Sequence, residues 1–155
     1  MEVSGKRVLV FGSGISGIGA AELLEKHGAQ VVLYDGNDKL KKEDVEGKLS
    51  ESSEAEIVIG DFPAELLDVL DLAILSPGVP LDLPVVAAMR EKGIPVTGEV
   101  ELAYEYGKGD VLAITGTNGK TTTTTLLGEI MRAHQEEVFV VGNIGNPYTV
   151  AADKM

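Results

Sequence analysis

The sequence predicts an α/β fold, in which a Rossmann-like domain with a parallel sheet is followed by the beginning of a second nucleotide-binding unit. Short apolar runs recur through the first hundred residues and are continuous, as in parallel strands that are covered on both faces. Helix-like segments separate most of these runs, which gives a βαβ series. Two glycine-rich turns, one after the first apolar run and one near residue 116, place phosphate-binding geometry in both parts.

Length and composition limit the classes of protein that fit. The 155 residues are 44% hydrophobic and 25% charged, which is enough for one full domain and part of another. A net charge of -12 opposes general binding to nucleic acid or to anionic membranes. There is no cysteine, which excludes disulfides and thiolate chemistry. No apolar run approaches the ~20 residues of a membrane span, and the first residues lack the pattern of a signal peptide, so a cytoplasmic protein is expected.

The first domain is expected to alternate strands and helices. In the first helix, Ile18, Ala21 and Leu24 share one apolar stripe, and Gly28 follows as a helix terminator. Residues 36–54 are polar and charged and predict a short surface helix and a solvated loop. The predicted strands are 8–11, 31–34, 57–59, 72–75 and 94–96, and the remaining predicted helices are 17–27, 83–92 and 99–106.

The first glycine turn is the motif Gly-Ser-Gly-Ile-Ser-Gly at residues 12–17, between a strand and a helix. The next strand ends at Asp35, 18 residues after Gly17, near the position of the ribose-binding acid of dinucleotide folds. NAD binding is therefore one interpretation, although no persuasive hydride-handling residue accompanies the motif. A tight turn that packs a helix closely and binds no ligand is a further interpretation.

A second candidate ligand loop is Ser76-Pro77-Gly78, which follows the strand at 72–75. Open α/β sheets bind ligands at the carboxyl ends of their strands. The proline stiffens the loop, and Gly78 removes a side chain where a ligand can approach. A plain turn explains the same residues nearly as well.

A flexible polar stretch at residues 107–110 marks a boundary, which predicts one domain at 1–107 and the start of another at 108–155. The second part reads as a strand at 111–114, a phosphate loop, a helix and a strand at 138–141. So small a unit cannot bury enough apolar surface to be stable alone. We expect it to dock on the first domain or on another copy of the chain.

The phosphate loop predicts an ATP site. Gly116 and Gly119 let backbone N–H groups approach a polyphosphate, at the positive end of the helix dipole. Lys120 adds a point charge, and Thr121 can place its hydroxyl on Mg²⁺. An ordinary strand-turn-helix is the alternative, but five consecutive threonines start this helix and are poor helix formers. The residues expected at the ATP phosphates are Gly116, Thr117, Asn118, Gly119, Lys120, Thr121 and Thr122.

The spacing departs from the ordinary P-loop, because Ile114 stands where G-x-x-x-x-G-K needs its first glycine. Thr-Gly-Thr-Asn-Gly-Lys-Thr at 115–121 instead resembles the ATP loop of the Mur ligases and their folylpolyglutamate synthase relatives. Together with residues 12–17, Asp35, Ser76 to Gly78 and Gly-Asn-Ile-Gly at 142–145, it resembles the N-terminal third of the D-glutamate-adding branch of the Mur ligases.

This resemblance implies that the first domain binds a uridine nucleotide and that the second part starts the central ATPase domain. The reaction implied belongs to peptidoglycan precursor synthesis: ATP phosphorylates the L-alanyl carboxylate of UDP-N-acetylmuramoyl-L-alanine, and the amine of D-glutamate attacks the acyl phosphate. Lys120 and Thr121 are the implied catalytic residues, the first through its charge and the second as a Mg²⁺ ligand. The residues implied at the UDP substrate are Gly14, Ile15, Ser16, Asp35, Gly36, Ser76, Pro77, Gly78 and Asn143.

The resemblance also leaves open points. Some relatives have an arginine where this chain has Asn37, so the charge partner of the diphosphate is not identified. The family also needs an acidic Mg²⁺ ligand, a histidine, a carbamylated lysine and a C-terminal domain, all beyond Met155. The chain is therefore expected to be an N-terminal fragment without ligase activity. A fragment of an NAD(P)-dependent oxidoreductase and a non-catalytic nucleotide-binding module are the alternatives.

Overall fold

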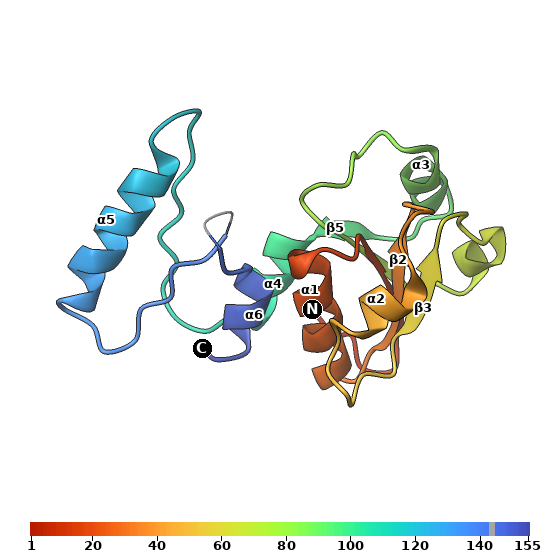
Figure 1. Cartoon of the computed structure of the whole chain (residues 1–155), viewed down its shortest axis with the longest axis horizontal. Helices are drawn as coiled ribbons and strands as arrows, with labels where there is room; N and C mark the ends of the chain where they lie inside the picture. The colour runs from red at the N-terminus through yellow and green to blue at the C-terminus, as the bar shows by residue number, and fades with distance from the viewer. Residues whose placement is uncertain (143–144) are drawn as a thin grey trace.

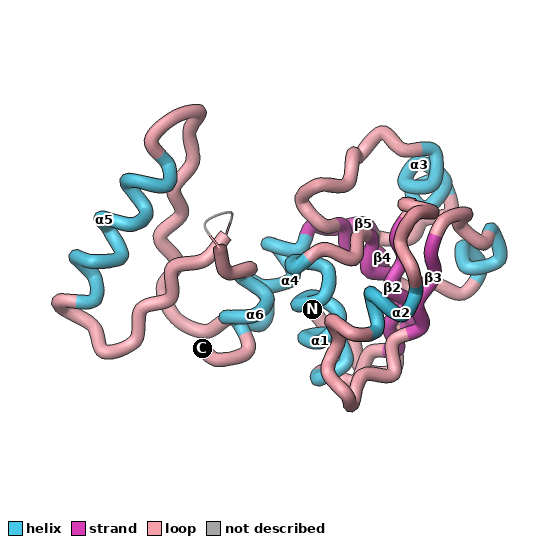
Figure 2. Tube along the Cα trace, viewed as in Figure 1, coloured by secondary structure: helices cyan, strands magenta, loops and turns pink. Residues whose placement is uncertain are grey.

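A single parallel sheet of five strands organises the first hundred residues. The computed structural model describes residues 1–142 and 145–155. Its strand order is β3-β2-β1-β4-β5, with every neighbouring pair parallel. The predicted parallel sheet is thereby confirmed. Figure 2 shows the strands in magenta. The strands are β1 (Arg7–Phe11), β2 (Gln30–Asp35), β3 (Glu56–Ile59), β4 (Leu72–Leu75) and β5 (Val96–Gly98).

Helices cover both faces of this sheet. One face packs against α1, α2 and α4, and the other packs against α3 and the short 3₁₀-helix η1; α6 lies on the outer side of α1 and α4 (Figure 1). None of the helices in the described ranges is both long enough and apolar enough to span a bilayer. The helices are α1 (Ile15–Lys26), α2 (Lys42–Glu46), η1 (Ala64–Asp68), α3 (Pro84–Glu91), α4 (Glu99–Tyr106), α5 (Lys120–Arg132) and α6 (Tyr148–Ala152).

The coverage of both faces explains why the strands are continuously apolar. In β1, Val8 and Val10 belong to the core on the α1 side, whereas Leu9 and Phe11 belong to the core on the α3 side. Successive side chains of a strand point to opposite faces, so a strand with two buried faces needs an apolar residue at every position. All four of these side chains are buried.

Helix α1 packs with the stripe that its sequence predicts. Ile18, Ala21 and Leu24 are all buried in the core. The opposite side of the same helix receives α6: a Cβ added at Gly19 would lie 2.8 Å from the Thr149 hydroxyl oxygen. The absence of a side chain at position 19 therefore allows α1 and α6 to approach closely.

The two strands predicted in the second part are not formed. Residues 111–114 and 138–141 have no strand pairing and run as irregular chain. A strand forms only where a neighbour accepts and donates its backbone hydrogen bonds, and the described residues supply no such neighbour beside these segments. Of the predicted β-loop-α-β unit, only the loop and the helix are formed; the two apolar runs flank them without becoming strands.

Helix α5 forms as predicted but stands apart from the sheet (Figure 1). The apolar side of α5 is exposed to solvent: Leu126 is 60% and Ile130 49% exposed, and Gly128 is the only buried residue of this helix. The second part was expected to dock on the first domain or on another copy of the chain. Docking on the first domain is observed for the chain after residue 145, where α6 packs on α1 and α4, but not for α5. Docking of α5 on another copy of the chain stays a prediction.

A buried carboxylate fixes α6, an element that the sequence reasoning did not foresee. Glu99, at the start of α4, is 4% exposed and accepts hydrogen bonds from the N–H and the hydroxyl of Thr149, at 3.1 and 2.8 Å. These two donors supply hydrogen bonds to the buried Glu99 side chain. One of them is a first-turn N–H of α6, which has no partner within the helix. An ion pair at 2.5 Å between Lys26 and Asp153 adds a link to α1.

Candidate nucleotide site

The strand order places a topological switch point between β1 and β4, and the loops that meet there, residues 12–17, 35–37 and 76–79, are called the crevice below. The chain continues from β1 to β2 on one side and returns to β4 on the other, and ligands of open α/β sheets bind at such a switch point. Hydrogen bonds join the loops there: Gly12 N–H donates to the Tyr34 carbonyl at 2.7 Å, and Ser76 N–H donates to the Phe11 carbonyl at 3.0 Å. The segments after β1, β2 and β4 thus meet at one edge of the sheet.

The first glycine turn is shaped by two close approaches. Gly12 has a φ of 105°, in the region that favours glycine, and a Cβ there would meet the Ser76 hydroxyl at 2.9 Å. A Cβ on Gly17 would lie 1.7 Å from the Gly12 carbonyl oxygen, so α1 can begin this close to β1 only with glycine. The third glycine, Gly14, is different, because a Cβ there would meet nothing within 4 Å.

The open space at Gly14 faces the start of α1. The N–H groups of the first helical turn have no partner within the helix and attract anions or acceptors. Ile15 begins the helix and is 72% exposed, and Ser16 follows it. The predicted residues 14–16 therefore form an accessible wall with backbone donors beside an apolar side chain.

Asp35 is tied to this turn by its side chain. Its Oδ2 accepts the Ser13 N–H at 2.8 Å and the Ser13 hydroxyl at 2.6 Å, and its Oδ1 accepts the Asn37 N–H at 3.0 Å. Burial raises the pKa of Asp35, but the hydrogen bonds from Ser13 and Asn37 and the charge of Lys48 outweigh burial and lower the pKa below its ordinary value. The carboxylate is therefore held ionised.

The loop after β4 completes this edge. Ser76 donates its hydroxyl to the Gly12 carbonyl at 3.4 Å, and its own carbonyl accepts the Val79 N–H at 3.0 Å in a tight turn around Pro77 and Gly78. A Cβ on Gly78 would meet nothing within 4 Å, so this part of the loop is open. The structure thus brings together the predicted residues of the first domain, with Gly36 directly after Asp35; Asn143 lies outside the described residues.

The predicted ATP loop is formed, but it lies away from this crevice, at the start of α5 (Figure 1). Gly119 caps the helix with a left-handed φ of 75°, and Lys120 donates from its ammonium to the Gly116 carbonyl. The Lys120 side chain thus folds back over residues 116–119 of its own loop. A Cβ on Gly119 would meet nothing within 4 Å, so the loop has room for phosphate oxygens.

The remaining loop residues fit phosphate binding better than metal binding. Thr117, Asn118, Thr121 and Thr122 are exposed. Over residues 1–142 and 145–155 no group of three or more His, Cys, Asp or Glu side chains could hold a metal ion. Thr121 offers one hydroxyl, whereas Mg²⁺ takes about six oxygen ligands. A metal at this loop would depend on phosphate oxygens and water.

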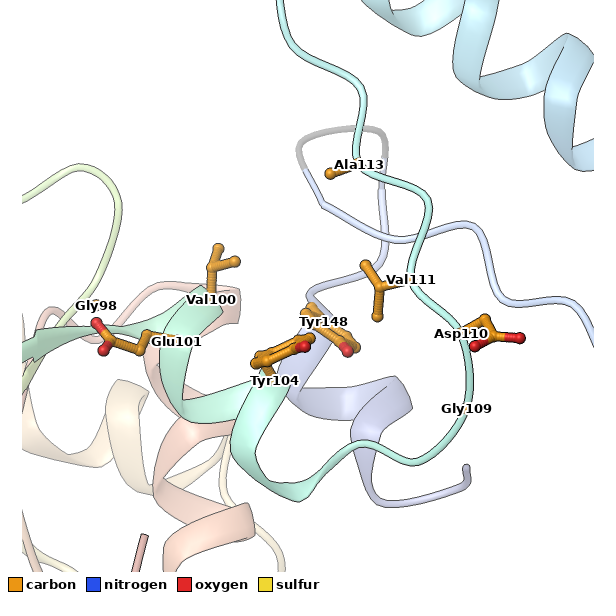
Figure 3. Close-up of a pocket in the computed structure, with 9 residues that line it drawn as sticks. All are labelled: Gly98, Val100, Glu101, Tyr104, Gly109, Asp110, Val111, Ala113 and Tyr148. Atoms are coloured by element: carbon orange, nitrogen blue, oxygen red, sulfur yellow. The ribbon is translucent and has the colours of Figure 1, made fainter.

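A separate hollow of about 830 Å³ lies between α4 and residues 109–113 (Figure 3). Tyr104 and Tyr148 border it, and none of the predicted site residues does. Tyr104 is 63% exposed. Tyr106, in contrast, stacks on His27 with ring centres 4.0 Å apart.

Comparison with known families divides the chain in two. Residues 6–98 match the family described as Mur ligase MurD-like, N-terminal domain. Residues 114–154 match the family described as Mur ligase middle domain. The first match covers the sheet and its crevice, and the second covers the phosphate loop, α5 and α6.

Similar proteins extend well beyond this chain. A UDP-N-acetylmuramoylalanine–D-glutamate ligase of Lachnospira eligens is 57% identical over 96% of the chain, and one of Lachnoclostridium phytofermentans is 54% identical over 96%. The chain spans about a third of the length of each, 33%. A pseudomurein peptide ligase type C from Methanothermus fervidus shares the fold, with a TM-score of 0.53 over 83% of this chain and 26% of its own, at 23% identity.

Proposed function

The chain belongs to the MurD-like Mur ligases of peptidoglycan synthesis, and we propose that it is the part of a D-glutamate-adding ligase that binds UDP-N-acetylmuramoyl-L-alanine and begins the ATP site. The observation that carries this proposal is the crevice at the switch point, in which three predicted segments meet around Asp35. The second observation is the separate glycine loop, within a segment that matches a domain that binds ATP in the family. The proposed location is the cytoplasm, where such precursors are made.

The crevice offers the chemical groups that a uridine nucleotide needs. The first-turn N–H groups of α1 and the open positions at Gly14 and Gly78 leave space for the diphosphate beside backbone donors. The exposed Ile15 provides an apolar surface for the base, and the ionised Asp35 provides an acceptor for a base or ribose donor. The chain's net charge of -12 repels a diphosphate at long range, so these local donors must bind it.

The phosphate loop supplies positioning and charge. MgATP, when bound, would supply the phosphoryl group that activates the L-alanyl carboxylate. The N–H groups from Gly116 to Lys120 would hold the phosphate chain, and the Lys120 ammonium would leave the Gly116 carbonyl for a phosphate oxygen. The Thr121 hydroxyl would be a ligand of the Mg²⁺. Because this loop lies apart from the crevice, we expect no D-glutamate-dependent phosphate release from the 155-residue chain alone.

Calorimetric titration of the chain with UDP-N-acetylmuramoyl-L-alanine, UDP and NADH tests the proposal. We expect the two uridine ligands to bind more tightly than NADH. Asp35→Asn should weaken UDP binding about three- to tenfold, because it removes one charge-assisted hydrogen bond. Asp71→Asn is the matched control: Asp71 also accepts a backbone N–H, from Arg7 at 2.8 Å, but at the opposite end of the sheet.

The competing interpretation is a nicotinamide-binding module. A preference for NADH over UDP, or equal effects of the Asp35 and Asp71 substitutions, would favour it and remove the support for a uridine site. The described residues near the crevice give it no specific support: Phe11 and Tyr34 there are buried in the core, and His27 stacks on Tyr106 at the far end of α1.

A further inference from the structure

We propose that Ser13 is a positioning residue of the nucleotide site: it holds the Asp35 carboxylate so that a single acceptor position, on Oδ1, is left for the ligand. The proposal rests on the proposed uridine site. It assigns a role to the one residue of the glycine turn that is neither a glycine nor part of the accessible wall of the crevice. Ser13 is a buried polar residue, 3% exposed.

Two hydrogen bonds join Ser13 to Asp35. The N–H and the hydroxyl of Ser13 both reach the same oxygen, Oδ2, at 2.8 and 2.6 Å. The turn makes this possible, because the left-handed Gly12 directs the next N–H toward the end of β2. Asp35 is thereby fixed to the strand beside its own, and its side chain loses the freedom to rotate.

The number of acceptor positions limits what a ligand can do. An ionised carboxylate offers about four lone-pair positions, two on each oxygen. Ser13 occupies both positions on Oδ2, and the Asn37 N–H, at 3.0 Å, occupies one on Oδ1. One position remains. The base of a uridine nucleotide offers a single ring N–H and matches it, whereas a ribose that directs both of its hydroxyls to the same carboxylate would leave one of them unpaired.

The occupied acceptor positions of Asp35 affect which nucleotide binds. An unpaired buried donor loses more binding free energy than one hydrogen bond contributes. Because Ser13 occupies Oδ2, ligands that need to donate to both oxygens of Asp35 are disfavoured. Ser13 therefore both orients the carboxylate and narrows the choice of nucleotide. The same bonds keep Asp35 ionised, since they stabilise the charged form.

Few other ionisable groups act on this carboxylate. Lys48, in the segment after α2, lowers the pKa of Asp35 through its charge. Tyr34, the preceding residue of β2, donates its hydroxyl to the Gly60 carbonyl at 3.0 Å; its pKa is raised by burial and then by the charges of Asp35 and Asp61. The Ser13 hydrogen bonds go to Asp35 and not to the Lys48 or Tyr34 side chain, so we expect a changed pKa of Asp35 in a Ser13 variant to report the loss of the Ser13 bond.

The test compares Ser13→Ala with Ser13→Thr in the 155-residue chain. Alanine removes the hydroxyl bond and keeps the N–H bond, whereas threonine keeps both. Ser53→Ala is the matched control, because the Ser53 hydroxyl also donates to a carboxylate, that of Glu25, at 2.8 Å and far from the crevice. Each variant is measured by NMR titration of the Asp35 carboxyl carbon without ligand, and by calorimetry with UDP and with NADH.

We expect Ser13→Ala to raise the pKa of Asp35, to weaken UDP binding about three- to tenfold and to reduce the preference for UDP over NADH. Threonine should restore the pKa and the affinity, and Ser53→Ala should change neither. An unchanged pKa of Asp35 in Ser13→Ala would overturn the proposal whatever the ligand is. A raised pKa with unchanged UDP affinity would also overturn it, because Ser13 would then tune a carboxylate that the ligand does not use.

Failure of the proposed function has a different signature. If the wild-type chain prefers NADH to UDP, the uridine site is wrong, while the titration of Asp35 without ligand still reports whether Ser13 controls the carboxylate. Thermal unfolding of the same variants identifies any general loss of structure, which would lower the melting temperature of Ser13→Ala. In that case the pKa of Asp35 and the UDP affinity of Ser13→Thr, compared with those of the wild type, decide the outcome.

Discussion

At the scale of single residues, the crevice depends on a few positions where the chain cannot accept another side chain. The three glycines of the first turn look equivalent in sequence, yet each has a different surrounding. Gly12 adopts a positive φ, Gly17 lies against the Gly12 carbonyl, and Gly14 borders open space. The first two positions serve the fold, and the third serves the ligand.

Alanine at Gly17 and at Gly14 should separate these roles. Gly17→Ala places a Cβ 1.7 Å from a backbone oxygen, so we expect a loss of about 3 kcal/mol of unfolding free energy or failure to fold. Gly14→Ala should change stability by less than about 1 kcal/mol, because φ there is -73° and the space is free, and should instead weaken UDP binding. Urea unfolding and calorimetry measure the two effects; equal stability of both variants would contradict the assignment.

Asp35 predicts a pH dependence of stability. Its pKa is lower in the folded chain than in the unfolded one, so its stabilising effect is full above the unfolded value of about 4 and is lost as pH falls through the folded value. Asp35→Asn should therefore be less stable than wild type at pH 7, with a gap that narrows below about pH 4. Urea unfolding between pH 7 and pH 3 measures the gap. A gap that stays constant with pH would show that the charge of Asp35 does not stabilise the fold.

At the scale of secondary-structure elements, α6 shows how a short helix is held by tertiary contacts. Five residues are too few for a helix that is stable alone. Burial of Tyr148, Ala151 and Ala152 and the bonds to Glu99 supply what local propensity lacks. Helix α5 is the reverse case, with 13 residues in the helix and an apolar side left in solvent.

Thr149→Val tests the attachment of α6. The substitution keeps the shape of the side chain and removes the hydroxyl donor, which leaves the buried Glu99 with one backbone bond. We expect a loss of about 1–3 kcal/mol in unfolding free energy. Thr123→Val is the matched control on α5, where the exposed side chain should make a difference of less than about 0.5 kcal/mol. Similar losses in both variants would mean that the Glu99 bonds contribute nothing.

At the scale of the whole molecule, a well-packed sheet domain is joined to a segment with exposed apolar side chains. Along residues 108–142, Val111, Leu112, Leu126, Ile130 and Phe139 are exposed. Apolar side chains gathered on one segment favour association. The net charge of -12 opposes association of two copies at low salt.

We therefore expect weak self-association that increases with salt, since salt at 0.1 M screens the repulsion between charges more than about 10 Å apart. Sedimentation velocity at two salt concentrations measures it. Leu126→Lys with Ile130→Lys should keep the chain monomeric without lowering the melting temperature of the sheet domain. Association that persists in the double variant would place the contact elsewhere, for example at the hollow beside Tyr104.

Sequence reasoning succeeded where local pattern and tertiary environment agree. The first four strands of the sheet, α1 with its stripe, and α5 with its glycine cap follow from periodicity and from glycine positions. The fifth strand was predicted at 94–96 and lies at Val96–Gly98. It failed at 111–114 and 138–141, where an apolar run has the composition of a strand but no partner to pair with, and at α6, whose five residues carry no helical signal. For the crevice, the residues after each strand were predicted, but the bond between Ser13 and Asp35 was not.

The sequence by itself determined the order of the five sheet strands, the two glycine-rich loops and the family, because these depend on neighbours along the chain. Only the tertiary structure decided which loops meet, which glycines border space and which apolar runs become strands. The physical reason is that backbone pairing and burial depend on partners distant in the sequence. Ser13 and Asp35 are 22 positions apart and meet only because β1 and β2 lie side by side.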